Sequence, residues 1–370
     1  MVVRCTNSAT GNSQASPPQI HPISPTSKST PMNRQFPPEI IQLIVNASLK
    51  PYDVFESPAT DAKMRYSLRK SYALLNSTWR GATQAELVKW VEIRTEDWAK
   101  KFLEFAEQRG GSVDGVKDMF VYSAHFTDAR TLAKLLRCVP QLINFYVYGG
   151  SVDIYDLAQL QKLRRLELDN CSIVGTPSSS QRRLSQLQRL SIRDCPFEDS
   201  ALQFLTPTFL PQLRRVDTPG LSIMAPLIPQ LEIINARSGY GDFHLLARAK
   251  SLLLLPLPHS ADKRLDMLAN LPSLPPFLYP VIPPYNAVDA SEELADALED
   301  LLGTKKSGLR VILLKEYGID DSIRSLIQRF EERGVRVQLV DLDFEGAIIE
   351  MEEIRANEKR AAEAAEARRR

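Results

Sequence analysis

One eleven-residue pattern occurs twice in the middle of the chain, in the same phase. Residues 163–173 read Leu163-Arg-Arg-Leu166-Glu-Leu168-Asp-Asn-Cys171-Ser-Ile173, and 24 residues later the chain reads Leu187-Gln-Arg-Leu190-Ser-Ile192-Arg-Asp-Cys195-Pro-Phe197. The alternating apolar residues predict a short strand whose alternate side chains point into a core. Two in-phase copies therefore predict a repeat protein in which each unit contributes one strand.

Less regular copies of this frame continue on both sides. Copies begin at residues 116, 142, 163, 187, 213, 231 and 252, a clear late copy begins at Leu309, and a last strand is expected at Val335–Val340. Between the strands, Asp128–Cys138 and Glu198–Leu205 have the apolar spacing of short helices. The period and pattern resemble those of leucine-rich repeats. We therefore expect an α/β solenoid, a leucine-rich-repeat horseshoe, over residues 94–343.

The remaining segments differ from the repeats in composition. Residues 1–33 are rich in Ser, Thr and Pro and are expected to form a disordered tail. Residues 34–93 predict a small all-α unit that precedes the solenoid. Residues 266–290 contain six prolines and predict an irregular stretch within the solenoid. Residues 344–370 are charged and rich in helix-forming residues, which predicts a helical tail.

The segment before the repeats carries a second pattern, in two halves. The first half is Phe36-Pro37-Pro38-Glu39-Ile40-Ile41-Gln42-Leu43-Ile44, an apolar helix with proline in its first turn. The second half is Tyr72-Ala73-Leu74-Leu75-Asn76-Ser77-Thr78-Trp79-Arg80. Both halves in this order, followed by leucine-rich repeats, resemble the F-box and leucine-rich-repeat proteins of fungi. The stretch Lys50–Asp61 makes the link between the halves longer than the compact family pattern.

This resemblance implies a substrate receptor of an SCF-type ubiquitin ligase. The F-box-like helices would bind a Skp-family adaptor, which connects to a cullin, and the repeats would hold a target protein. Carried over position by position, the adaptor-binding residues would be Pro37, Pro38, Ile40, Leu43, Ile44, Leu74, Leu75 and Trp79. Such a subunit is not an enzyme, because it only holds a target lysine near an activated ubiquitin.

The same residues have an alternative interpretation without a ubiquitin ligase. Solenoids need caps at their apolar ends, and a small helical unit is a suitable cap. The chain would then be a leucine-rich-repeat scaffold for protein interactions. In that case Ile40, Ile44 and Leu75 would form the core of a helical bundle instead of an adaptor surface.

The residues between the frame leucines should face the concave side of the sheet, where a target would bind. The predicted target-binding residues are Phe120, Tyr122, Tyr146, Tyr148, Arg165, Arg189, Arg193 and Arg215. Aromatic rings next to arginines suit a peptide with an apolar anchor and an acidic or phosphorylated segment. Alternatively, the arginines pair within the sheet with Glu167, Asp169 and Asp217.

Composition and motifs argue against several other functions. The net charge is +1 and basic residues are not clustered, so neither nucleic acid nor a membrane surface is an expected partner. Four scattered cysteines and a polar N-terminus favour the cytoplasm or nucleus. The four histidines lack metal-ligand spacing, and no Gly-x-Ser-x-Gly or His-Glu-x-x-His motif occurs. We therefore expect no metal, no cofactor and no catalytic site.

Overall fold

The strand frame forms a single parallel sheet. The structure, a computed structural model, describes residues 37–49, 71, 77–126, 130–175, 183–236, 242–258, 260–280, 296, 308–315, 321–340 and 344–369. Eleven strands pair in parallel, each with its neighbours in the order of the chain. They are β1 (Trp90–Ile93), β2 (Asp118–Tyr122), β3 (Asn144–Tyr148), β5 (Arg165–Asp169), β7 (Arg189–Arg193), β8 (Arg215–Thr218), β9 (Ile233–Ala236), β10 (Leu254–Leu257), β11 (Phe277–Pro280), β12 (Val311–Lys315) and β13 (Arg336–Val340).

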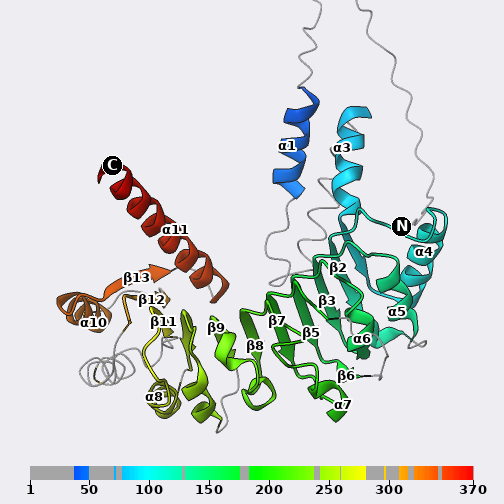
Figure 1. Cartoon of the computed structure of the whole chain (residues 1–370). Helices are drawn as coiled ribbons and strands as arrows, with labels where there is room; N and C mark the ends of the chain where they lie inside the picture. The colour runs from blue at the N-terminus through cyan, green and yellow to red at the C-terminus, as the bar shows by residue number, and fades with distance from the viewer. Residues whose placement is uncertain are drawn as a thin grey trace, which may run out of the picture.

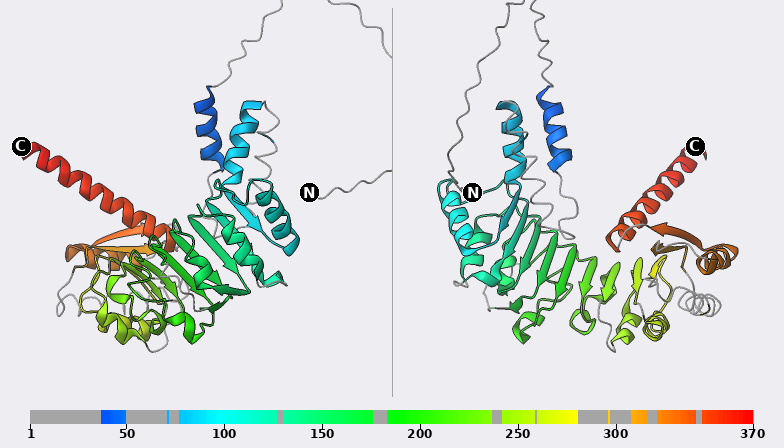
Figure 2. Two further views of the ribbon diagram at one scale, coloured as in Figure 1. Left: turned by 45° about the vertical axis from the view of Figure 1, so that its right-hand side comes forward. Right: turned by 180° about the vertical axis from the view of Figure 1, so that it is seen from behind.

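The return segments lie on the outer side of this curved sheet, as Figures 1 and 2 show. The helices among them are α4 (Glu96–Glu107), α5 (Arg130–Arg137), α6 (Ile154–Leu157), α7 (Asp199–Leu202), α8 (Ala261–Ala269) and α10 (Asp321–Glu332). Elsewhere the chain returns through the 3-10 helices η1 (Ser123–His125), η2 (Ser222–Met224), η3 (Ile228–Gln230) and η4 (Phe243–Arg248). The strands β4 (Ser151–Asp153) and β6 (Ser172–Val174) form a separate pair. Two 3-10 helices between β8 and β9 account for the shortest repeat spacing.

The frame leucines build one continuous core between the sheet and the return segments. Leu163, Leu166 and Leu168 are buried, as are the equivalent residues of the next unit, and the core extends from Ile93 to Val335. The strands are in the register that the frame predicts, since Leu166 lies opposite Leu190. This is the architecture of a leucine-rich-repeat solenoid, as the frame predicts.

The turn after the strand also repeats between units. Asn170 and Asp194 precede the two frame cysteines and have φ angles of 53° and 49°. This left-handed conformation is one that Asn and Asp tolerate better than most residues. The two units therefore present Cys171 and Cys195 in the same way.

Two strands lie in segments that the sequence assigns as a whole to other classes of structure. The strand β1 occupies the strand-like stretch Trp90–Ile93 at the end of the helical unit of residues 34–93, and it pairs with β2, so the sheet begins at Trp90. The proline-rich range 266–290 contains the end of α8 and the strand β11, which pairs with both β10 and β12. The range is thus not irregular throughout, because Pro280 stands at the last position of the strand. Residues 281–290 lie outside the described residues.

Three helices are not return segments of the repeats. The helices α1 (Pro38–Leu49) and α3 (Ser77–Val88) stand side by side near the first strands (Figures 1 and 2). The helix α11 (Phe344–Arg369) begins at the inner side of the last strands and then extends away from them (Figure 1). Among the described residues, no helix combines the length and apolarity needed to cross a membrane.

Candidate functional site

The helix α1 has one inner and one outer apolar face. Ile41 is 2% exposed and Val45 is fully buried, and both pack against the half-buried Trp79 of α3. Ile40 is 40% exposed and Leu43 is 62% exposed, although both are large apolar residues. The helix therefore uses Ile41 and Val45 for its own packing and presents other apolar residues to solvent.

The predicted adaptor-binding residues are divided between these two faces. Pro37, Pro38, Ile40 and Leu43 are exposed, and Ile44 is half-buried. Trp79 packs against the buried face of α1 and so supports that helix. Leu74 and Leu75 lie outside the described residues. The cluster around Ile41 and Val45 is separate from the main core, so α1 does not extend the core of the solenoid.

The aromatic residues predicted on the concave face form one connected group. The Phe120 and Tyr146 rings are stacked with their centroids 4.0 Å apart, and Tyr122 lies 5.8 Å from Phe120. Tyr148 adds a fourth ring, 6.0 Å from that of Tyr122. Phe120 is buried in this group, whereas Tyr148 is exposed. The exposed part of the group therefore lies at the carboxyl ends of β2 and β3.

Hydrogen bonding fixes the ring of Tyr146 within this group. Its hydroxyl donates to Asp169 Oδ2 at 3.2 Å. Burial, together with the negative charge of Asp169, raises the pKa of Tyr146 well above its usual value. Tyr146 thus stays protonated and remains a hydrogen-bond donor at any physiological pH.

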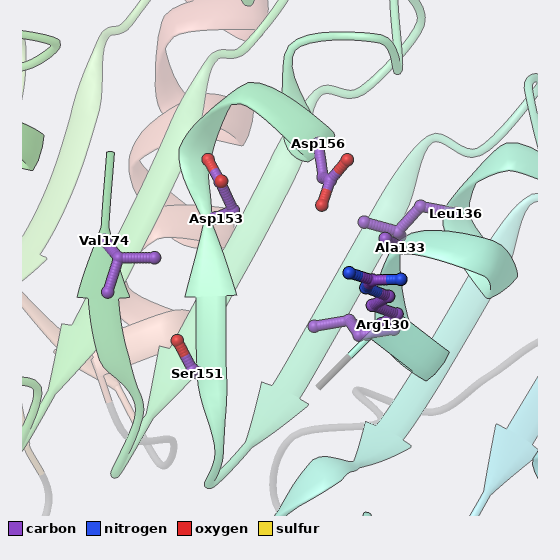
Figure 3. A pocket seen from close by; sticks show the side chains of 8 residues that line it. Arg130, Ala133, Leu136, Ser151, Asp153, Asp156 and Val174 are labelled. Atoms are coloured by element: carbon purple, nitrogen blue, oxygen red, sulfur yellow. The ribbon is translucent and has the colours of Figure 1, made fainter. Parts of the chain in front are cut away.

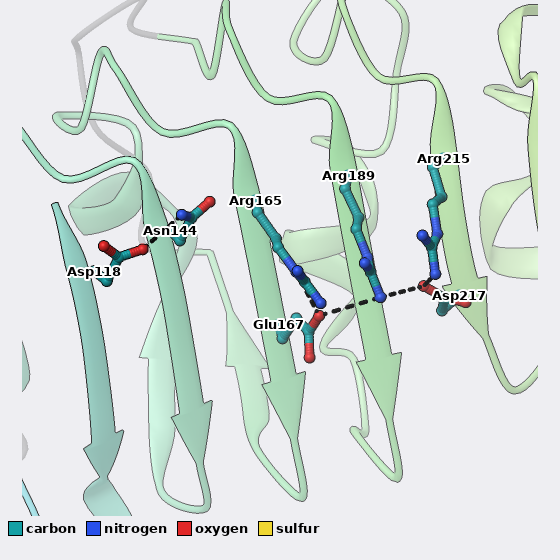
Figure 4. Close-up of polar contacts among 7 residues, drawn as sticks. All are labelled: Asp118, Asn144, Arg165, Glu167, Arg189, Arg215 and Asp217. Carbon is teal, nitrogen blue, oxygen red and sulfur yellow. Dashed lines mark hydrogen bonds and ion pairs between the residues drawn. The ribbon is translucent and has the colours of Figure 1, made fainter. Parts of the chain in front are cut away.

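Three of the four predicted arginines are paired within the sheet. Figure 4 shows Arg165, Arg189 and Arg215 on three successive strands, with Glu167 and Asp217 between them. Arg165 Nε lies 2.9 Å from Glu167 Oε1, and Arg189 Nη2 lies 3.4 Å from both Glu167 Oε1 and Asp217 Oδ2. Arg215 Nη2 completes the row at 3.3 Å from Asp217 Oδ2. We call these five residues the ion-pair ladder.

The ion-pair ladder is part of the structure of the sheet. Glu167 and Asp217 are buried, and Asn235 donates a further hydrogen bond to Asp217 Oδ1 at 2.9 Å. Without their carboxylate partners, like charges on adjacent strands would repel each other. Of the two interpretations of these arginines, internal pairing is the one found, with Glu167 and Asp217 as the partners.

Arg193 differs from the three ladder arginines. It lies on β7, opposite Asp169 of β5, and is only half-buried. Within the described part of the chain its guanidinium forms no ion pair, and its Nε is buried without a hydrogen-bond partner. Arg193 is therefore the one of the four predicted arginines that lies outside the ion-pair ladder, two strands away from Tyr148 of β3.

The concave face of the last strands is covered by the chain itself. Ala347, Ile348, Met351 and Ile354 of α11 are buried against apolar residues of the inner sheet face. The sheet residues in this second core are Ile233, Leu254, Phe277, Tyr279, Val311, Leu313 and Val340. The Phe344 ring at the start of α11 lies 5.7 Å from that of Tyr279 and 5.4 Å from the Arg215 guanidinium. This cover was not expected from the sequence, and it leaves the open concave face to the earlier strands.

A cleft lies on the outer side of the solenoid, away from the concave face. It has a volume of about 470 Å³ and lies between α5 and the pair β4–β6, with Arg130, Asp153 and Asp156 in its wall. Figure 3 shows the side chains that line it, with Arg130 on α5 and Asp153 at the end of β4. Asp153 also caps α6, because its Oδ1 accepts the Tyr155 N–H at 2.9 Å. Across the described ranges, no group of three or more His, Cys, Asp or Glu residues could hold a metal ion.

Comparisons with known proteins add little to this description. No family model matches the sequence, and no curated protein matches it. An internalin (inlF) from Listeria monocytogenes is 16% identical with a TM-score of 0.29, over 62% of this chain and 55% of that chain. The mouse RP105/MD-1 complex gives 15% identity and a TM-score of 0.25, over 60% and 46%. The chain thus spans about half the length of these solved chains, and neither likeness bears on its function.

Proposed function

We propose that the protein is the substrate-recognition subunit of an SCF-type ubiquitin ligase. The helices α1 and α3 bind a Skp-family adaptor and through it a cullin, while the concave face of the solenoid holds a target protein. The proposal rests on the F-box-like pattern that precedes the repeats. It places the protein in the cytoplasm or nucleus and gives it no catalytic residues of its own.

The observation that carries the proposal is the exposed apolar face of α1. Ile40 and Leu43 are exposed although the same helix buries Ile41 and Val45 against α3. Large apolar residues that gather on an exposed helix face commonly mark a binding surface. Pro37 and Pro38 are exposed next to this face, which matches the positions that the F-box resemblance assigns to adaptor contact.

In this proposal the chain acts by holding the target in place. Binding to the adaptor and to the target at the same time turns ubiquitin transfer into a reaction within one complex. The local concentration of the target lysine then rises by an amount that depends on the geometry of the assembly. The solenoid suits this role, because one continuous core fixes its binding face relative to its first strands.

The open end of the concave face is the proposed target site. Tyr122 and Tyr148 offer apolar ring surface, and Arg193 offers a guanidinium without an ion pair. A peptide with an apolar side chain followed by an acidic or phosphorylated residue would match these groups. In this refined site the ladder residues Arg165, Arg189 and Arg215 support the sheet, and Phe120 and Tyr146 hold the outer rings.

Adaptor binding can be tested by co-purification. The full chain is expected to retain a purified Skp-family adaptor, and Ile40→Ala and Pro38→Ala are expected to weaken that binding. Ile349→Ala is the matched control, because Ile349 is another solvent-exposed isoleucine and lies on α11. Failure of the unaltered chain to retain the adaptor would overturn the proposal. Equal loss in the control variant would mean that the α1 surface is not the adaptor site.

The target site is tested by measuring target turnover in cells of the source organism. Tyr148→Ala and Arg193→Glu are expected to slow turnover, with adaptor binding unchanged. Arg164→Glu is the matched control, since Arg164 is an exposed arginine just before β5, outside the proposed site. Unchanged turnover in both variants would exclude this end of the concave face.

One observation favours the alternative, a leucine-rich-repeat scaffold without a ubiquitin link. Val88, at the end of α3, packs against the main core of the solenoid, as a cap would. The cluster of Ile41 and Val45 does not join that core. In a pure cap, the outer face of α1 has no partner, so the co-purification experiment separates the two functions.

A further inference from the structure

The two frame cysteines lie opposite each other on adjacent units of the solenoid. Asp169 pairs with Arg193 two residues before them, and Ile173 pairs with Phe197 two residues after them. Neighbouring strands of a sheet are about 4.8 Å apart. That spacing falls within the Cα separations of roughly 4.4–6.8 Å that disulfides span. The backbone therefore holds Cys171 and Cys195 at a distance that a disulfide could bridge.

The two cysteines are also in direct contact. The Cys171 backbone N–H donates to Cys195 Sγ at 3.3 Å. Cys171 Sγ further lies 3.2 Å from Asp169 O, and Cys195 Sγ lies 3.0 Å from Arg193 O. The hydrogen bonds from each thiol to backbone carbonyls account for a cysteine at this frame position in a single unit. They do not account for cysteines at this position in two adjacent units.

Only one of the two thiols has access to solvent. Cys171 is fully buried, whereas Cys195 is half-buried. Cys195 lines an open cleft of about 450 Å³, together with Phe197, Leu202, Pro219, Gly220, Ile223 and Asp242. A small oxidant in this cleft would reach Cys195 and not the buried Cys171.

The surroundings make the accessible thiol the more acidic one. The neighbouring Cys171 side chain lowers the pKa of Cys195, against the opposing effect of burial. The Cys195 side chain, together with burial, raises the pKa of Cys171. Cys138 is similarly half-buried, but burial and the charge of Glu107 raise its pKa. The thiolate is the form of cysteine that reacts with oxidants, which favours Cys195 over the other two.

We propose that Cys195 and Cys171 form a peroxide-responsive thiol pair. The Cys195 thiolate attacks one oxygen of hydrogen peroxide, which breaks the O–O bond, releases hydroxide and leaves Cys195 as a sulfenic acid. The Cys171 thiol then attacks the Cys195 sulfur and displaces the oxygen, which leaves as water once it has taken up the thiol proton. Two thiols are oxidised to one disulfide, and one peroxide is reduced. A cellular dithiol reverses the reaction by thiol–disulfide exchange.

The disulfide would join two successive units covalently. It would also remove the thiol hydrogens that face the carbonyl oxygens of Asp169 and Arg193. These two residues end the strands β5 and β7 on the concave face. Oxidation would therefore act at the edge of the solenoid that is closest to Arg193. The thiol pair itself does not depend on the proposed ubiquitin-ligase role.

The test is to treat the reduced full chain with hydrogen peroxide and map the products by mass spectrometry. Trypsin cleaves after Arg189 and Arg193, so Cys171 and Cys195 lie on separate peptides unless a disulfide joins them. We expect a joined peptide pair that dithiothreitol separates. We also expect Cys195 to be modified several-fold faster than Cys138. Equal reactivity of Cys195 and Cys138, or oxidation of Cys195 without the joined pair, would overturn the proposal.

Two variants assign the order of the steps. Cys171→Ser should accumulate the Cys195 sulfenic acid, which dimedone traps, because the second thiol is missing. Cys195→Ser should leave Cys171 reduced, because Cys171 has no access to the oxidant. Dimedone adducts on Cys171 in the second variant would contradict the assigned roles. Should either variant fail to fold, the relative rates of Cys195 and Cys138 in the unaltered chain still decide the question.

Discussion

Arg189 and Glu167 lie on adjacent strands, and their side chains meet with Nη2 and Oε1 3.4 Å apart. Glu167 at the same time accepts a hydrogen bond from Arg165, so one buried carboxylate serves two guanidinium groups. The concave face of the middle strands is thus held together by charge, whereas that of the last strands is held together by apolar packing against α11.

Removal of the shared carboxylate should destabilise the middle of the sheet. Glu167→Gln leaves Arg165 and Arg189 with one charged partner fewer, and breaking a buried ion pair costs about 3–5 kcal/mol. The expected result is a clear fall in the midpoint of thermal unfolding. Glu198→Gln, at an exposed carboxylate before α7, should change it little. Equal effects of the two substitutions would show that the ion-pair ladder does not stabilise the fold.

Truncation of two neighbouring isoleucines of α11 should change stability by very different amounts. Ile348 is 6% exposed in the second core, and Ile349 is 60% exposed. Ile348→Ala should lower the free energy of unfolding by about 2–5 kcal/mol, the usual effect of truncating a core isoleucine. Ile349→Ala should change it by less than about 0.5 kcal/mol. Chemical denaturation of both variants measures the difference, and similar values would contradict the position of α11.

Gly149 should not tolerate a side chain. Its φ is 73°, and a Cβ atom there would lie 3.0 Å from Ala124 Cα and 3.1 Å from Ala124 N. The left-handed conformation alone costs an alanine about 1–2 kcal/mol, and a contact with backbone atoms adds to this. Gly149→Ala should therefore lower the melting temperature.

Gly81 is the matched control for that substitution. It lies within α3, and a Cβ atom there would meet nothing within 4 Å. Gly81→Ala should raise stability by up to about 1 kcal/mol, because alanine is the better helix former. If both glycine variants are destabilised equally, the conformation at Gly149 is not the cause.

The carboxyl group of Asp156, in the cleft beside α5, makes the free energy of unfolding depend on pH. Burial, with the nearby charge of Asp153, raises the pKa of Asp156 above its usual 3.8, although Arg137 opposes the shift. The folded state then holds this proton more tightly than the unfolded state does. The resulting loss of folding stability is absent below pH 3.8 and grows as the pH rises through the raised pKa of Asp156.

Asp156→Asn should remove this penalty. The variant should melt at a higher temperature than the unaltered chain at pH 7, and the difference should shrink toward pH 3. The effect should be small, since about a third of the side chain is exposed and its charge is screened. A difference that grows on acidification would have the wrong sign for a raised pKa.

The strand frame could be predicted from the sequence because each strand repeats the same burial pattern. Leucines at fixed positions must face a core, and that requirement also sets the register of neighbouring strands. The frame does not specify how the outward residues are paired. Arg189 and Arg193 lie on the same strand, but only Arg189 lies within 4 Å of a carboxylate. Such distances depend on side-chain geometry that a one-dimensional pattern does not contain.

The sequence contains a pattern that indicates the cover over the last strands. Leu254, Phe277 and Val311 occupy outward frame positions that carry charged residues in the middle units. Three successive apolar residues at a position that should face solvent imply that another element covers them. The matching stripe on α11 is Ile348, Met351 and Ile354, with the spacing of one helix face.

The position of α11 in the chain imposes an order on folding during synthesis. The strands β9–β13 leave the ribosome before the helix that covers their concave side, so this apolar surface has to wait for its partner. Nascent chains that stall between β13 and α11 would expose the apolar concave face of the last strands, which is the kind of surface that chaperones bind. The charged inner face of the middle strands has no such delay, and the early units can mature while the late ones are still being made.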